Sequence, residues 1–94
     1  MFIITLRFAD KTKAPQFMDG HNAWIKRGFD DGVFLLVGSL WPNAGGAILA
    51  DNGLRADIEA RMQEDPFVAE GVVSGEILEI TPGRTHERLA FLKA

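Results

Sequence analysis

The chain contains no cysteine, which excludes disulfides, thiolate metal sites and cysteine nucleophiles together. It also lacks a long apolar run, because no stretch approaches the ~20 residues that a membrane-spanning helix needs. No basic segment precedes the first apolar residues, which run directly into Ala9-Asp10-Lys11, so a signal peptide is not expected. We therefore expect a cytoplasmic protein without a membrane partner.

Basic residues are not in excess either. Ten lysines and arginines stand against thirteen aspartates and glutamates, interspersed along the chain, which argues against nucleic acid as a partner. The two histidines, His21 and His86, belong to no short-range motif of metal ligands. Gly45-Gly46 and Gly71 lack the strand-to-helix setting of a phosphate-binding loop. We expect no metal and no nucleotide or other cofactor.

What the chain has is a high share of hydrophobic residues in a short length. Its 94 residues correspond to a single domain, 1–94, with a core at 1–81 and a C-terminal tail at 82–94. Hydrophobic residues make up 47% of the sequence, near the upper end of ordinary globular usage. A chain of this size buries only a modest core, so part of this apolar surface is expected to meet a partner chain.

The first half of the chain predicts a strand, a helix and a hairpin. Alternating apolar residues over 2–8 are typical of a strand. The apolar period becomes helical over 15–31, with a proline suited to the first turn. Residues 33–41 and 47–50 then read as two strands joined by a turn at 42–46.

The second half predicts a helix and a last strand. Asp51 and Asn52 offer N-caps to a helix of about ten residues, which Pro66 ends. Residues 67–70 fit one further turn, and 72–80 form the last strand. The buried edge of the helix is expected to consist of three residues at four-residue spacing: Leu54, Ile58 and Met62.

This order, β-α-β-β-α-β, predicts an α+β fold of ferredoxin-like type, with four antiparallel strands and two helices on one face of the sheet. The strand at 33–41 is apolar on both of its alternating faces, whereas the helices cover only one. We therefore expect a homodimer that packs through its sheet faces and forms a shared barrel.

His21 is the first candidate for chemistry, because it lies among apolar residues of the first helix: Phe17, Met18, Trp24 and Ile25. An imidazole in such a setting is a candidate general acid or base. A lone histidine on an apolar helix face is also often a core residue whose ring nitrogens are satisfied locally. The sequence leaves both interpretations open, together with the protonation state of the ring.

Asp65 is the candidate partner of His21. A carboxylate that holds the tautomer of a general base and stabilises its imidazolium improves catalysis. Both helices are expected on the same face of the sheet, so the end of the second can meet the flank of the first. Aspartate followed by proline is also a common helix N-cap, and the two roles do not exclude each other.

Three further residues are candidates for substrate binding. Ser39 follows Gly38 near the end of a buried strand, where its hydroxyl can bind a substrate oxygen or simply bond its own loop. Trp24 and Trp41 are candidates to line an aromatic pocket, with core packing as the alternative. A core of this size needs large residues in any case.

The chain resembles the YciI-like, YCII-related domain family of small dimeric α+β barrel proteins, from Met1 to about Ile80. The resemblance is carried by His21-Asn-Ala-Trp-Ile25, by residues 31–38 and by residues 65–73, which begin Asp-Pro-Phe-Val. It implies that His21 and Asp65 form an active-site dyad in a pocket beside the sheet. The chain departs from the family in having Gly38-Ser39 where Gly-Pro is common, and in lacking an arginine within 17–20.

We therefore expect a small cofactor-independent enzyme that transfers protons on a small organic metabolite, aromatic or lactone-like. His21 would be the acid or base, Asp65 would orient it, and Ser39 would bind a substrate oxygen. Elimination, isomerisation and hydrolysis all remain open, and the resemblance supplies no substrate. The alternative is a non-catalytic dimeric module that binds a small ligand or stabilises a larger enzyme, with His21 as a structural core residue.

Overall fold

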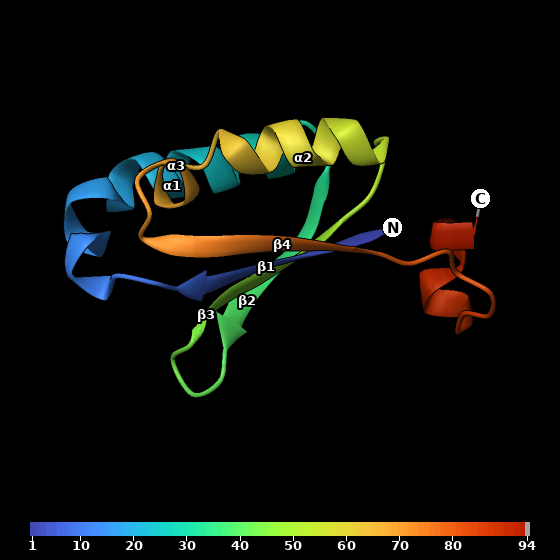
Figure 1. The fold of residues 1–94 in the computed structure, drawn as a ribbon. Coiled ribbons are helices and arrows are strands. Elements are labelled where there is room, and N and C mark those ends of the chain that lie inside the picture. Colours follow the sequence, from blue (N-terminus) through green and yellow to red (C-terminus); the bar gives the residue numbers. More distant parts are fainter. Residues whose placement is uncertain (94) are drawn as a thin grey trace.

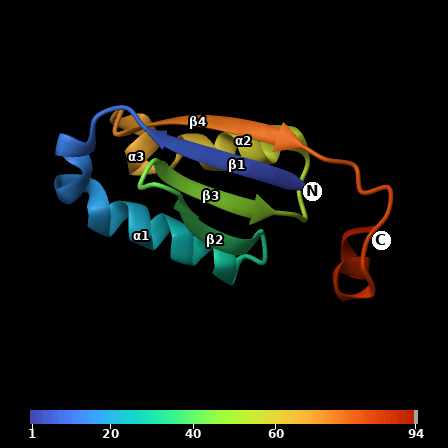
Figure 2. The same ribbon diagram turned by 90° about the horizontal axis from the view of Figure 1, so that it is seen from below.

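Four strands form one antiparallel, open sheet in the computed structural model, which describes residues 1–93. The strands are β1 (Phe2–Phe8), β2 (Phe34–Leu40), β3 (Gly45–Ala50) and β4 (Val73–Glu79). Their order across the sheet is β2-β3-β1-β4, and every neighbouring pair is antiparallel. Figure 2 shows this sheet from its open face, with the helices behind it. The fold is therefore α+β, as predicted.

Three α-helices lie together on the other face of the sheet (Figure 1). They are α1 (Ala14–Asp30), α2 (Arg55–Gln63) and the single turn α3 (Pro66–Ala69). Two 3-10 segments, η1 (Lys11–Lys13) and η2 (Glu87–Lys93), complete the described chain. No helix in residues 1–93 is long and apolar enough to cross a membrane.

The core lies between the sheet and these helices. β1 alternates as predicted, so that every second side chain is buried against the helices. α1 contributes Trp24, whose indole Nε1 donates a hydrogen bond to the backbone oxygen of Arg61, 2.9 Å away, and so ties α1 to α2. The largest fully buried apolar side chains are Trp24, Phe34, Ile4, Ile48, Ile58 and Val72.

Gly28 allows α1 to approach β2 closely. A Cβ added at Gly28 would lie 2.0 Å from the ring of Phe34, a distance that no real side chain tolerates. Phe34 in turn packs edge-on against Trp24, with 5.0 Å between ring centroids. Glycine at this position therefore sets the spacing between the helix that carries His21 and the sheet.

The second long helix begins later than predicted. Asp51 and Asn52 do not cap it, because Asn52 adopts a positive φ of 62° and its side chain donates to the backbone oxygen of Gly32 instead. α2 starts at Arg55 after an N-cap at Leu54, and Asp57 accepts a hydrogen bond from the Leu54 backbone. Leu54 is consequently exposed, so its predicted place on the buried edge is wrong; the burial of Ile58 and Met62 is confirmed.

The prediction that the strand at 33–41 is covered on both faces is not met within one chain. Phe34 is buried beneath the helices, but a β-bulge follows it, and Leu36 on the open face is 57% exposed. Leu78 of β4 and Ile80 just after it, at the opposite edge of the sheet from β2, are also exposed, at 47% and 40%. The open face thus keeps a set of uncovered apolar side chains.

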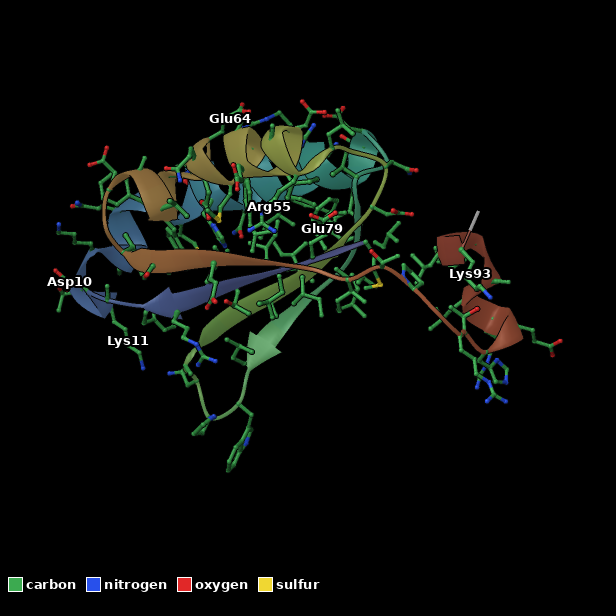
Figure 3. All side chains as sticks on the ribbon, turned by 45° about the vertical axis from the view of Figure 1, so that its right-hand side comes forward. Asp10, Lys11, Arg55, Glu64, Glu79 and Lys93 are labelled. Carbon is green, nitrogen blue, oxygen red and sulfur yellow. The ribbon has the colours of Figure 1, made fainter. Side chains whose placement is uncertain are left out.

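α2 is anchored to β4 by Arg55. Figure 3 shows Arg55 between α2 and the strand, near Glu79. The guanidinium contacts Glu59 at 3.1 Å and Glu79 at 3.7 Å, and it donates to the backbone oxygen of Ile77 at 3.3 Å. These partly exposed contacts hold α2 along the sheet and place its C-terminal end beside α1.

The C-terminal segment leaves the sheet after β4 and extends beyond the end where the N-terminus lies (Figures 1 and 2). The sequence does not indicate whether this tail packs on a neighbour or is frayed. The structure gives it a 3-10 segment in which Leu92 is buried, whereas Leu89 and Phe91 are exposed. The tail lies at the other end of the sheet from α3 (Figure 1), and none of its described residues lines the cavity described below.

Candidate active site

Asp65 lies in the two-residue connection, Glu64 and Asp65, that turns the chain from α2 into α3. Its backbone is extended (φ −66°, ψ 121°), as proline at the next position favours. Its Oδ1 accepts a hydrogen bond from the Phe67 backbone N–H, 3.0 Å away, so Asp65 caps α3. The N-cap interpretation of Asp-Pro is therefore correct. It also fixes the direction in which the carboxylate points.

The same Oδ1 atom faces His21 of α1, with 2.8 Å between it and the imidazole Nδ1. The two residues are 44 positions apart in the sequence and meet because α1 and α3 pack together. This packing is close at Gly20, where an added Cβ would lie 3.1 Å from Pro66 Cγ. The structure thus brings together the two residues named as a pair from the sequence.

The plane of the His21 ring is fixed from two sides. The ring stacks on Phe67 with 3.9 Å between centroids and 5° between planes. Trp24 lies farther along the helix, at 5.9 Å and 28°. Only 13% of the His21 side chain is exposed. Few rotamers are open to a ring held by a flat stack and a hydrogen bond, so the imidazole is preorganised.

Asp65 is fully buried, and among residues 1–93 no other polar or charged side chain is. Its second oxygen, Oδ2, has no protein partner within the described chain. A buried carboxylate is costly unless it is paired, so the contacts to His21 and to the Phe67 N–H carry much of its stabilisation. Such a group is unusual as a mere helix cap, which solvent-exposed aspartates serve equally well.

This arrangement selects one tautomer of His21. An ionised carboxylate only accepts hydrogen bonds, so Nδ1 carries the proton that it receives. The other ring nitrogen, Nε2, then holds a free lone pair. A histidine oriented in this way by a carboxylate can accept a proton at Nε2 and later return it.

A cavity of about 390 Å³ opens beside the His21 ring, between α1 and the helix-facing side of the sheet. This volume falls within the range of about 300–1,000 Å³ that small-molecule sites occupy. Its walls are mainly apolar and come from α1, α3 and all four strands. They include Leu6, Met18, Ile25, Val37, Ile48 and Phe67.

No protein-family model matches the chain, and no curated protein matches it. The candidate site therefore rests on the geometry of its own residues.

The structure separates the three proposed substrate-binding residues. Ser39 lines the cavity, at the register position of β2 that pairs with Gly46 of β3. Trp24 is fully buried behind the His21 ring and does not line the cavity. Trp41 lies in the turn after β2, 91% exposed, and is not part of the cavity wall either. The tryptophan nearest the histidine is a core residue, as its alternative interpretation held.

Two residues of the site were not singled out from the sequence. Phe67 supplies the stacking surface for His21, and Asn22 brings a polar side chain to the cavity wall. Phe67 had a signal in its position, because it follows the Asp-Pro cap by two residues and its N–H is the one that the cap binds. The sequence offers no comparable indication for Asn22, because a residue opposite the apolar stripe of the helix is expected to face solvent.

Within residues 1–93, no three histidine, aspartate or glutamate side chains gather closely enough to hold a metal ion.

Proposed function

We propose that the protein is a small enzyme that transfers a proton on an organic metabolite bound beside His21. The observation that carries this proposal is the 2.8 Å contact between His21 Nδ1 and a fully buried carboxylate, made by a ring that lines a cavity of ligand size. A preorganised imidazole backed by a carboxylate is suited to general acid and base catalysis without a cofactor.

In this mechanism Nε2 of His21 takes a proton from a carbon or oxygen of the substrate or, in a hydrolysis, from the water that attacks the substrate. Asp65 stabilises the imidazolium that forms, through the hydrogen bond at Nδ1. The flat face of Phe67 also favours a positive ring over it. The proton then returns to another substrate atom in an isomerisation, or to a leaving group in an elimination or hydrolysis. Ser39 binds a substrate oxygen from the β2 wall.

The family and the finer fold belong to the same proposal. The chain resembles YciI-like proteins in the residues around His21 and Asp65, and the contact between these two residues supports that assignment. We assign the sheet to the ferredoxin-like type, supported by the order of strands and helices and by helices on a single face. The short α3 is an addition to that order.

A homodimer through the open sheet faces completes the proposal. Leu36, Leu78 and Ile80 leave apolar surface uncovered on that face, where the helices do not reach. We expect light scattering at micromolar concentration to show a dimer, and Leu78→Glu to convert it to a monomer. A wild-type protein that is strictly monomeric would exclude the shared barrel.

The proposed activity is tested by screening small lactones and substituted phenols in deuterated water, following substrate loss and deuterium incorporation by mass spectrometry. His21→Ala is expected to lower the rate by about 10²-fold to 10⁴-fold, the usual contribution of a general acid or base. Asp65→Asn is expected to lower it by at least about tenfold, because the tautomer and the imidazolium lose their support. His86→Ala, which changes the exposed histidine of the tail, is the matched control and should retain full turnover.

The competing function, a non-catalytic binding or accessory module, gives a different result in the same set of variants. It requires that His21→Ala and Asp65→Asn destabilise the fold without changing any turnover per folded molecule. Full turnover in both variants on an identified substrate would exclude the dyad as a catalytic group.

A further inference from the structure

Apart from His21, the cavity wall formed by residues 1–93 has no side chain that can carry a positive charge and receive an acid group. Among the described residues, no lysine, arginine, aspartate or glutamate side chain lines it, and its polar side chains are His21, Asn22 and Ser39. The segment 17–20 at the start of the wall carries Asp19 and no basic residue. A carboxylate or phosphate on a ligand would therefore lose its hydration here without gaining an ion pair.

A buried negative charge lies beside the cavity, next to His21. Asp65 is fully buried directly behind the His21 ring, and its Oδ2 has no protein donor in the described chain. Partly buried charges are screened far less than exposed ones, so this carboxylate acts on whatever occupies the cavity. A neutral His21 leaves the pair with a net negative charge, which repels an anionic ligand.

The polar groups of the wall come from two elements. Asn22 follows His21 on α1, whereas Ser39 comes from β2, and both side chains are exposed to the cavity. An amide and a hydroxyl both donate and accept hydrogen bonds, so together they suit a neutral carbonyl, amide or hydroxyl group. The remaining wall is apolar. Gly38 of β2 and Gly46 of β3 line the cavity without a side chain, and they lie close together, because a Cβ added at Gly46 would lie 3.3 Å from the Gly38 oxygen.

We infer that the site takes an uncharged ligand, with an apolar body and one neutral oxygen-bearing or amide edge that Asn22 and Ser39 bind, and that it rejects carboxylates and phosphates. This inference rests on the proposed function in that it assigns a substrate class to the His21 site. It narrows the candidates to neutral lactones, ketones, amides and phenols in their protonated form.

The experiment is a titration of ¹⁵N-labelled protein with benzamide and, separately, with benzoate, two probes of nearly the same shape and different charge. Benzamide is expected to shift the backbone amides of Asn22, Ser39 and Gly46 and to bind at least about tenfold more tightly than benzoate, as unpaired charge in a low-dielectric site predicts. Benzoate that binds as tightly as benzamide overturns the inference. So does benzamide that shifts none of these amides.

Two matched variants test whether the preference for benzamide over benzoate arises in the cavity. Ser39→Lys puts a cation on the cavity wall and is expected to narrow or reverse the preference for benzamide. Ala60→Lys adds the same charge to an exposed position of α2, outside the cavity and away from the open sheet face, and it should leave the preference unchanged. An equal effect of both lysines would show that net charge, not the cavity, sets the preference.

The outcome is independent of the catalytic test. Binding of the two probes needs no turnover, so a charge preference found in a protein whose dyad variants keep full activity would leave the ligand class intact and remove only the catalytic role. Loss of turnover in those variants, together with tight benzoate binding, would support the catalytic role and exclude the proposed ligand class.

Discussion

The two faces of the sheet differ in what covers them, and β1 shows the difference within one strand. Ile4 points to the helices and is fully buried, whereas Ile3, its neighbour in the sequence, points to the open face and is half-buried. The covered face holds the core and His21. The open face holds uncovered leucines such as Leu36 and Leu78. The same alternating pattern thus builds the core on one side and leaves apolar side chains uncovered on the other, where we propose the dimer contact.

The sharpest separation of the two faces is expected from Ile4→Ala and Ile3→Ala. Truncating a fully buried isoleucine removes its transfer energy and leaves a cavity, so Ile4→Ala should lower the free energy of unfolding by about 2–5 kcal/mol. Ile3→Ala should cost less than half as much at low protein concentration, and its cost should grow with concentration as the dimer forms. Urea unfolding at two concentrations measures both. Equal costs, independent of concentration, would remove the distinction between the faces.

The contact between α1 and the covered face is tested at Gly28. Gly28→Ala forces a methyl group into the Phe34 ring, so we expect a loss of about 1–3 kcal/mol in the free energy of unfolding, as overpacked cores show. Gly83→Ala is the control, because an added Cβ there meets nothing within 4 Å. Thermal unfolding of both variants measures the difference. A Gly28→Ala protein as stable as Gly83→Ala would mean that helix and sheet are not held so closely.

A smaller change in the free energy of unfolding is expected to separate the two roles of Asp65, as the N-cap of α3 and as the partner of His21. Asp65→Ala removes both the cap of α3 and the partner of His21, whereas Asp65→Asn keeps an oxygen that can accept from the Phe67 N–H. The cap alone is worth about 1 kcal/mol, so Asn should be the more stable variant by roughly that amount. Both should lose activity. Chemical denaturation with a parallel turnover assay measures this, and an active Asp65→Asn protein would reduce Asp65 to a cap.

Much of this fold was open to prediction from local patterns. The period of two in β1 and the helical period of α1 are strong signals, because each was long enough to repeat several times. The start of α2 was mispredicted, because Asp51 and Asn52 look like caps in sequence while Asn52 is held in a turn by a bond to Gly32, 20 residues away. Such a contact leaves no mark in the local sequence.

The site was predictable only in part, for a similar reason. His21 stood out because a polar ring interrupted an apolar helix face. Asp65 stood out because the end of the second helix was expected to meet the flank of the first, and because the resemblance to YciI-like proteins pairs the two residues. The cavity and the stack of His21 on Phe67 depend on how α1 and α3 lie against each other. Trp24 and Trp41 show the limit most clearly: both are large aromatics in apolar surroundings, yet one is buried in the core and the other is 91% exposed.

The smallest change in stability is expected from a substitution on the solvent side of α1, away from both faces of the sheet. The hydrogen bond from Lys26 to Asp30, aided by the charge of Asp30, raises the pKa of Lys26 above its ordinary value. A raised pKa adds stability below the ordinary lysine pKa, and that stability is lost as pH rises through the folded value. The pair is exposed, so Lys26→Met should leave thermal unfolding at neutral pH without measurable change. A clear loss would show that surface pairs matter here.

The pairing of His21 with Asp65 can be observed directly from the ring nitrogens of ¹⁵N-labelled histidine by NMR. In the neutral ring, the geometry predicts a proton on Nδ1, bound to Asp65, and a bare Nε2 whose resonance shifts when benzamide enters the cavity. His86, exposed in the tail, supplies the internal reference. A neutral His21 that carries its proton on Nε2, with no response to benzamide, would contradict the dyad.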